Sequence, residues 1–420
     1  MTTASDAASD ASVAAALDAW IAAHFDDEVA FLRELVRVPT DTPPGDNVPH
    51  ANRASELLTA LGFTVERYAP PVEEVLAAGL ASVVNLVVRH RFGEGGPTVA
   101  LNSHGDVVPP GDGWTQDPYG GEIVDGRMYG RGVAVSKSDF ATYAFALRAL
   151  IDSGAPLAGS IELHFTYDEE FGGLLGPAWL LANGITKPDL AIGASFAHSI
   201  VTAHNGCLQL AVTVRGRAAH AAMPETGADA IAAAVVLMNA LYAHAKGLKS
   251  IRSRVAGIGS PTLNIGRIEG GINTNVVPDR VTFKLDRRLI PEESPARVEA
   301  ELNALLADAL PTTEGITLSV ERLLLARALA PLPGHERLVD AFADAGEAVL
   351  GSRPAATATP LYTDARLYGE AGVPIVLYGA GPRTILEANA KRADENLLLS
   401  DLQAATRVVA RALANLLAPG

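Results

Sequence analysis

The chain has 420 residues, of which 48 % are hydrophobic and 19 % are charged. That share of apolar residues can build a sizeable core and excludes a disordered chain. The formal net charge of −15 argues against a nucleic-acid partner, because an acidic surface repels phosphate groups. Cys207 is the only cysteine, so the chain forms neither an internal disulfide nor a thiolate metal cluster. We see no signal-like start and no long uncharged apolar run, and we expect a cytoplasmic protein without a membrane segment.

The first half of the chain alternates between predicted helices and strands. Residues 1–12 are small and polar and predict a frayed tail, whereas apolar residues recur at helical spacing over 13–38. The predicted strands then cover 83–88, 98–102, 160–166 and 189–193, and the predicted helices cover 139–153 and 176–183. This alternation is typical of an α/β domain with a largely parallel, buried sheet.

The pattern changes after Gly206. Six elements follow in the order strand, helix, strand, strand, helix, strand, and they cover 208–216, 228–245, 262–270, 280–288, 295–309 and 316–323. This order is the split β-α-β pattern of a ferredoxin-like domain. A strand at 374–379 and a helix from Ser400 then restore the α/β character. We therefore expect a discontinuous catalytic domain, residues 1–206 and 324–420, interrupted by an α+β lid domain, residues 207–323.

Polar residues follow two of the predicted strands. The strand at 98–102 leads into His104 and Asp106, and the strand at 160–166 leads into Asp168, Glu169 and Glu170. Open α/β sheets bind ligands at the carboxyl ends of their strands. Asp106 could hold the second ring nitrogen of His104, and three adjacent acids are costly unless a cation lies opposite them. The sequence therefore predicts the active site at this edge of the sheet.

Several longer stretches resemble the dinuclear zinc exopeptidase and deacylase superfamily, which includes acetylornithine deacetylase, succinyl-diaminopimelate desuccinylase, aminoacylase and the glutamate carboxypeptidases. They read SHGDVVPPGDGWTQDPYGGEIVDGRMYGRG, DEEFGG, RGRAAHAAMPETGADAI, GGINTNVVPDR, LDRRLIPEE and LYTDARLYGEAGVPIVLYGAGP. The similarity runs from about residue 30 to the end of the chain. It implies a hydrolase of amide-type C–N bonds that acts on a small carboxylate-bearing substrate and forms a homodimer through its lid.

The resemblance also implies roles for residues of the catalytic domain. Glu169 would be the general base, and Glu170 would be a ligand of the second metal ion. His104 would be a ligand of the first metal ion, with Asp106 behind it.

In the lid and the returning part of the chain, the resemblance implies a substrate site. His220 would reach the active site, often that of a partner subunit, as an oxyanion donor. Asn275 and Arg288 would grip the substrate carboxylate, which is physically natural for the planar fork of an arginine. Tyr362 stands where relatives often have a small residue, so it would either narrow the pocket or pack in the core.

Three positions depart from the family pattern. Val135 stands in place of the bridging aspartate, Ala194 in place of an acidic ligand, and Lys391 in place of the last histidine ligand. His104 and Glu170 are then the only remaining candidate ligands, whereas catalytic zinc needs about three. Loss of the two metal ions removes positive charge from the site. The loss of two carboxylates and the bridging hydroxide, together with the gain of a lysine, offsets that change. We therefore expect no cofactor, or at most one weakly held divalent ion.

This departure leaves three functions open. The leading interpretation is an amide hydrolase with an atypical or metal-free site. A second is an epimerase, isomerase or lyase in which Glu169 and Lys391 move a proton at carbon. A third is an inactive homologue that only binds its ligand. A metal site could also persist if Asp139 or Asp168 had taken over as ligands.

Overall fold

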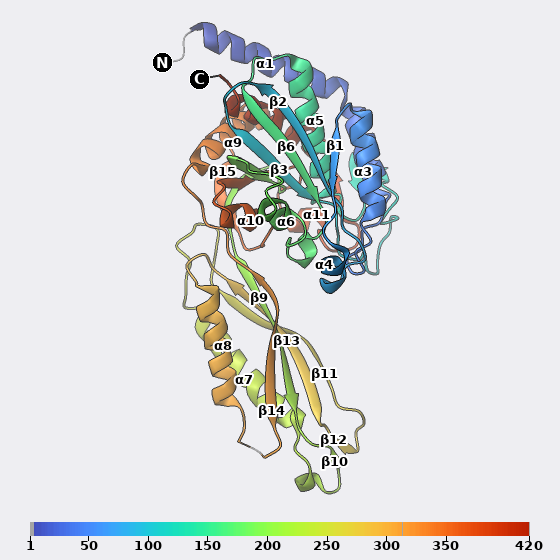
Figure 1. The fold of residues 1–420 in the computed structure, drawn as a ribbon, viewed down its shortest axis with the longest axis vertical. Coiled ribbons are helices and arrows are strands. Elements are labelled where there is room, and N and C mark those ends of the chain that lie inside the picture. Colours follow the sequence, from blue (N-terminus) through green and yellow to red (C-terminus); the bar gives the residue numbers. More distant parts are fainter. Residues whose placement is uncertain (1–3, 313, 420) are drawn as a thin grey trace. The chain divides into compact units, whose positions relative to one another are not determined.

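The computed structural model describes residues 4–312 and 314–419, and the chain divides into two compact units (Figure 1). The first unit contains the chain up to Thr202, together with Pro331–Thr357 and the part from Thr363 onward. The second unit contains Ala203–Ala330 and Ala358–Tyr362. The second unit is thus inserted into the chain of the first unit.

The first unit is built on an eight-stranded sheet with the order β1-β2-β6-β3-β7-β16-β8-β15. Its centre is parallel, because β3 runs parallel to β6 and β7, and β16 runs parallel to β7. The pairs β1–β2, β2–β6 and β8–β16 are antiparallel. The strands are Val65–Tyr68 (β1), Asn85–Gly93 (β2), Thr98–His104 (β3), Gly159–Thr166 (β6), Leu190–Gly193 (β7), Ser199–His204 (β8), Ala355–Thr359 (β15) and Ile375–Leu377 (β16). The expected α/β fold with a largely parallel sheet is confirmed.

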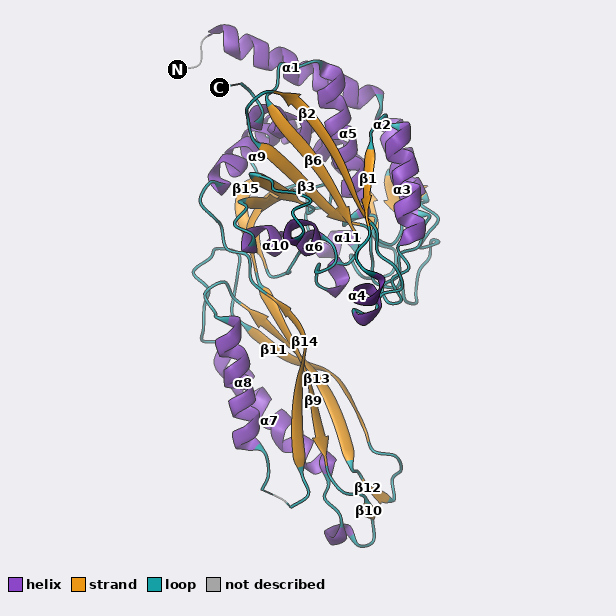
Figure 2. Cartoon of the chain, viewed as in Figure 1, coloured by secondary structure: helices purple, strands orange, loops and turns teal. Residues whose placement is uncertain are grey.

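Helices lie on both faces of this sheet, as Figure 2 shows. Nearly every side chain of β6 and β7 is buried, as expected for strands covered on both faces. The helices are Ala4–Ala23 (α1), Phe25–Val36 (α2), Val48–Ala60 (α3), Val72–Ala77 (α4), Lys137–Ser153 (α5), Pro177–Ala182 (α6), His335–Leu350 (α9), Ala365–Glu370 (α10), Ile385–Ala388 (α11) and Leu399–Leu416 (α12). A small sheet of Ile123–Val124 (β4), Arg127–Tyr129 (β5) and Asn396–Leu398 (β17) completes the unit.

The N-terminal region differs from the expectation. Residues 4–12 belong to α1 and are not a frayed tail, because their alanines favour a helix; residues 1–3 lie outside the described part of the chain. The single helix expected over 13–38 is broken at His24. Its imidazole stacks on Trp20 and its Nδ1 atom lies 2.8 Å from the carbonyl oxygen of that residue, so α1 ends there.

The second unit has a four-stranded antiparallel sheet with the order β11-β13-β9-β14. Two helices pack on this sheet in the β-α-β-β-α-β chain order, so the expected ferredoxin-like arrangement is confirmed. Its elements are Gly206–Arg215 (β9), Ala230–Leu248 (α7), Thr262–Gly270 (β11), Arg280–Leu289 (β13), Pro295–Ala309 (α8) and Thr317–Ala326 (β14). A ribbon of Ala219–His220 (β10) and Val276–Val277 (β12) extends from it.

Helix α7 is the most apolar helix of this unit. Ala230, Ala233, Ala234, Leu237 and Leu241 form the face that packs in the core of the unit. By length and composition it would also suit a membrane span, and it is the one such helix in the described part of the chain. The expectation that no segment spans a membrane therefore stays a prediction.

Candidate active site

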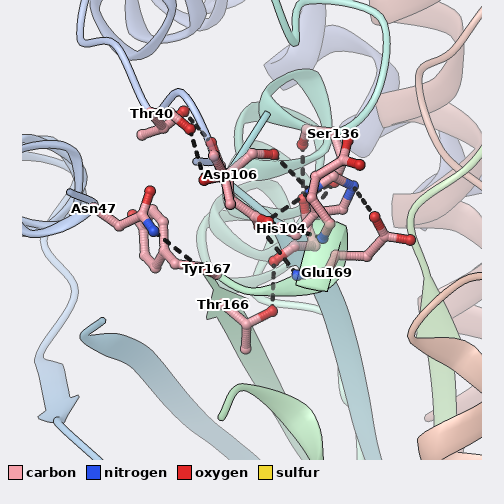
Figure 3. Close-up of polar contacts among 12 residues, drawn as sticks. Thr40, Asn47, His104, Asp106, Ser136, Thr166, Tyr167 and Glu169 are labelled. Carbon is pink, nitrogen blue, oxygen red and sulfur yellow. Dashed lines mark hydrogen bonds and ion pairs between the residues drawn. The ribbon is translucent and has the colours of Figure 1, made fainter. Parts of the chain in front are cut away.

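The parallel pairing of β3 and β6 brings the two polar segments together. His104 lies opposite Thr166 in the sheet register, and the N–H of Gly105 donates to the carbonyl of Thr166 at 2.8 Å. The loops that leave both strands therefore start side by side. Figure 3 shows His104, Asp106 and Glu169 gathered at this edge.

Asp106 holds the acidic segment in place. This fully buried carboxylate accepts the N–H of Glu169 at 3.3 Å and the N–H of Glu170 at 2.9 Å. It thereby anchors the short 3-10 helix Glu169–Phe171. For His104, the closer partner of Nδ1 is the backbone carbonyl of Asp106 at 2.9 Å, whereas the carboxylate lies 3.4 Å away. The carboxylate thus orients the glutamates as well as the imidazole, which the sequence motif did not reveal.

The pKa values of His104 and Glu169 are both raised, but by different causes. Burial alone would lower the pKa of His104, but Glu169, Asp106 and Glu170 raise it to about 10. Burial raises the pKa of Glu169 to about 7, and Glu170 and Asp106 add to this effect against the opposing cations. The imidazole Nε2 lies 3.9 Å from the Glu169 carboxylate. The site therefore holds a cationic histidine beside a carboxyl group that titrates near neutrality.

Lys391 supplies a second cation to the same site. Its Nζ atom donates to Glu170 at 2.7 Å. The glutamate side chain is 11 % exposed and the lysine side chain 63 %. Partial desolvation would lower the pKa of Lys391, but Glu170 and Glu169 outweigh it and raise the pKa. The ammonium group therefore stays charged and offsets the charge of the glutamates.

The donor atoms present do not fit a dinuclear metal centre. Val135 and Ala194 offer no donor side-chain atom, and the ammonium of Lys391 cannot coordinate a metal while protonated. Within residues 4–312 and 314–419, no three side chains of histidine, cysteine, aspartate or glutamate form a group that could hold a metal ion.

Asp139 and Asp168, the possible replacement ligands, are both engaged with the backbone. Asp139 accepts the N–H of Ala380 at 2.8 Å, and Asp168 accepts the N–H of Leu175 at 2.5 Å. Burial raises the pKa of Asp139 well above its ordinary value and raises that of Asp168 to about 7. Each carboxyl group thus supports a loop through one oxygen, whereas its other oxygen (Oδ2 of Asp139, Oδ1 of Asp168) is buried without a hydrogen-bond partner among the described residues. In the described part of the chain, neither aspartate belongs to a group of three side chains that could hold a metal ion.

The structure also identifies supporting residues that the sequence did not single out. Thr40 donates its hydroxyl to the carbonyl of Gly105 at 2.6 Å, and the Asn47 amide donates to the carbonyl of Tyr167 at 3.1 Å (Figure 3). The Ser136 hydroxyl accepts the N–H of His104 at 3.0 Å. These contacts join segments that are far apart in the chain, so no local sequence pattern predicts them.

The remaining expected site residues belong to the second unit. His220 and Asn275 are exposed and lie on the ribbon of β10 and β12, where the carbonyl of Asn275 accepts the N–H of Ala221 at 3.0 Å. Arg288 lies at the other end of β13, and its guanidinium carbon is 5.5 Å from the ring centre of Tyr362.

One chain does not bring all of these residues together. The start of β13 at Arg280 adjoins the ribbon, and Arg288 lies eight residues further along, roughly 27 Å for an extended strand. Asn275 and Arg288 of one chain therefore lie too far apart to share a single carboxylate. Tyr362 instead packs on Arg288, and the Arg288 Nε donates to Asp286 at 2.8 Å.

Comparison with known proteins gives the family. Residues 100–415 match the model of peptidase family M20/M25/M40. The chain belongs to this family. It is 31 % identical over 399 residues to a succinyl-diaminopimelate desuccinylase of Rhodospirillum centenum, covering 91 % of this chain and 95 % of the relative. A homologous desuccinylase of Methylobacterium nodulans is 31 % identical over 402 residues, covering 92 % and 95 %.

Solved structures of the M20 family share the fold. A metallo-carboxypeptidase from Sulfolobus solfataricus superimposes with a TM-score of 0.76 at 18 % identity, covering 93 % of this chain and 99 % of that one. A dinuclear metal-binding peptidase from Bacillus subtilis gives a TM-score of 0.66 at 16 % identity, with coverage of 94 % and 99 %. Membership confirms the resemblance and the enzyme class expected from the sequence, a hydrolase of amide-type bonds.

Proposed function

We propose that this M20 protein hydrolyses an amide-type bond in a small carboxylate-bearing substrate, and that it does so without the family's two metal ions. The observation that carries the proposal is the 2.7 Å ion pair between Lys391 and Glu170. Together with Val135 and Ala194, it leaves a site in which an ammonium and an imidazolium group supply positive charge.

The reaction follows from the roles that these groups can take. Glu169 removes a proton from water as the water oxygen bonds to the amide carbon. The charged His104 and Lys391 stabilise the negative oxygen of the tetrahedral intermediate. The C–N bond then breaks, and Glu169 returns the proton to the departing nitrogen. The products are a carboxylic acid and an amine, and Glu169 is ready for the next cycle.

The substrate is proposed from the relatives and from the lid residues. The relatives are succinyl-diaminopimelate desuccinylases, and we therefore propose an N-acyl amino acid as substrate. Arg288 would bind the carboxylate, with Tyr362 packed against its guanidinium. Because His220 and Asn275 lie at the far end of their sheet, we propose that they complete the site of a second copy in a homodimer. A cytoplasmic location suits such a small-molecule enzyme.

Metal analysis tests the proposal. Protein purified without chelators should contain well under one zinc or manganese ion per chain, and EDTA should leave its activity toward a panel of N-acyl amino acids unchanged. The variant with Val135→Asp and Lys391→His should take up more metal and lose native activity. Two ions per chain, with activity abolished by EDTA and restored by metal, would refute the metal-free site.

A second function is favoured by one contact. Lys391 pairs with Glu170, and its charge also acts on Glu169, so a carboxylate and an ammonium group are available as a base and an acid for proton transfer at carbon. Deuterium incorporation from heavy water into an intact N-acyl amino acid would select this reaction over hydrolysis. Binding of such compounds without turnover or exchange would indicate an inactive binding homologue.

A further inference from the structure

Lys391 is part of a turn with an uncommon backbone conformation. The φ angles are +49° at Asn389, +61° at Lys391 and +56° at Asp394. Asp125 is the only other non-glycine residue with positive φ in the described part of the chain. Side chains other than glycine rarely adopt this left-handed region, so surrounding contacts must hold the backbone there.

Asp394 provides these contacts. One oxygen of its carboxylate accepts the N–H groups of Thr115 and Gln116, at 2.8 Å and 3.3 Å, and the other accepts the Thr115 hydroxyl at 3.0 Å. The backbone carbonyl of Asp394 accepts the side-chain amide of Asn389 at 3.4 Å. The turn that carries Lys391 is thus closed on itself and fastened to the loop between β3 and β4.

We propose that Asp394 is a positioning residue that fixes Lys391 beside Glu170. The inference rests on the proposed function, in which this lysine supplies positive charge. A long, 63 % exposed lysine gains little from an ion pair alone, because the pair must restrict many side-chain rotamers. A backbone already fixed in the paired geometry leaves fewer conformations to lose on pairing.

The next residue secures the end of the turn independently. Glu395 is buried and pairs with Arg131 at 2.5 Å, and it accepts the N–H of Gly132 at 3.0 Å and that of Ala134 at 3.2 Å. Loss of the Asp394 carboxylate should therefore loosen residues 389–394 without unfolding the protein. This separation makes the positioning role testable in the intact chain.

The accessibility of the Lys391 amine reports its position directly. We would acetylate the folded full-length protein with N-hydroxysuccinimidyl acetate and follow the modification of Lys391 by peptide mass spectrometry. Lys187, an exposed lysine of the same unit, serves as the internal reference. The variants are Asp394→Ala, Asp394→Asn, Glu170→Gln and the double variant with Asp394→Ala and Glu170→Gln. The control is Asp125→Asn, which alters an exposed turn residue with φ +50°.

Asp394→Ala should speed acetylation of Lys391 relative to Lys187 by roughly two- to fivefold, the range expected for release of a partly exposed ion pair. Asp394→Asn should have a smaller effect, because asparagine keeps an acceptor oxygen and tolerates positive φ. Asp125→Asn should have none. The double variant should react no faster than Glu170→Gln alone, since both changes release the same contact.

Three results would overturn the inference in different ways. A faster reaction in Glu170→Gln with no change in Asp394→Ala would refute the positioning role and leave the proposed function intact. No change in Glu170→Gln would mean that the ion pair does not exist in solution, and the proposed metal-free site would fall with it. Additive effects in the double variant would show a general loosening of the loop and would likewise refute positioning.

Discussion

Glu169 is the side chain on which the proposed chemistry depends most. Its backbone N–H, not its carboxylate, anchors the 3-10 helix to Asp106, so Glu169→Gln should keep the fold. Removal of a general base typically lowers turnover by about 10²–10⁴-fold. Initial rates with N-acyl amino acids, compared with circular dichroism of the same preparation, measure both effects. Near-normal rates in this variant would show that another residue is the general base, and His104 would be the next candidate.

The pH dependence of activity should report the same carboxylate. The base must be deprotonated, and burial raises its pKa to about 7, so kcat/KM should rise as the pH rises through that value. His104, whose pKa is raised to about 10, stays charged over this range. A profile that is flat between pH 6 and pH 8 would argue against Glu169 as the base.

Arg288 should matter for binding much more than for stability. Its side chain is 32 % exposed, and its packing on Tyr362 and its contact with Asp286 fix the guanidinium. Arg288→Ala should weaken the binding of carboxylate ligands by roughly 2–5 kcal/mol, measured by calorimetry with N-acyl amino acids. Arg280→Ala, an exposed arginine at the start of the same strand, is the matched control. Unfolding of the Arg288 variant would show a structural role and would refute the proposal that Arg288 binds the substrate carboxylate.

The sequence predicts part of the candidate site and misses part for a physical reason. His104, Asp106, Glu169 and Glu170 follow buried strands directly, so their meeting at one sheet edge follows from parallel pairing. The roles assigned to them stay predictions. The contacts made by Thr40, Asn47 and Ser136 join segments from across the chain and leave no local signal.

At the scale of the elements, a buried glutamate between two helices should make the stability of the fold depend on pH. Glu28 of α2 is fully buried, and its Oε1 accepts the hydroxyl of Thr406 on α12 at 2.5 Å. Its other oxygen has no hydrogen-bond partner among the described residues. Burial raises its pKa to about 8. The folded protein therefore keeps this proton from about pH 4.5 to pH 8, whereas the unfolded chain releases it.

The contribution of Glu28 to stability is thus complete below about pH 4.5 and is lost as the pH rises toward 8. Glu28→Gln removes the titration while keeping the shape of the side chain. The variant should be more stable than the parent at pH 8.5, by up to about 4 kcal/mol, and should gain much less at pH 5. Urea unfolding at both pH values measures the difference. An equal effect at both pH values would show that Glu28 is not protonated in the folded state.

Elements are predictable where burial dictates the pattern. The helix expected over 295–309 matches α8, because Val298, Leu302 and Leu306 form a buried face at helical spacing. The strand expected over 262–270 matches β11, although only Leu263 of its residues is buried. The break between α1 and α2 was missed, because it depends on the stacking of Trp20 and His24 and not on a proline or glycine. The prediction of a frayed tail is wrong for residues 4–12, since the alanines among their serines and aspartates favour a helix.

At the scale of the whole molecule, the second unit has an apolar surface that its own core does not use. Ile231, Val235 and Tyr242 recur at helical spacing on one face of α7 and are 42 %, 44 % and 46 % exposed. The neighbouring strand β11 exposes Ile268 and lies at the edge of its sheet, where β13 is its one partner among the described strands. An apolar helix face beside an open edge strand is suited to a two-fold interface with a second copy.

The intact protein should therefore be a dimer at micromolar concentration in light scattering. The double variant Val235→Glu with Tyr242→Glu should be a folded monomer, because two buried charges would face each other across the two-fold axis. Val72→Glu with Leu76→Glu, which alters apolar residues of α4 that are 59 % and 61 % exposed, should leave the dimer intact. If His220 and Asn275 complete a partner's site, the monomeric variant should also lose turnover while its unfolding temperature changes little. If the parent protein is already monomeric and active, both the proposed dimer interface and the proposed shared site are refuted.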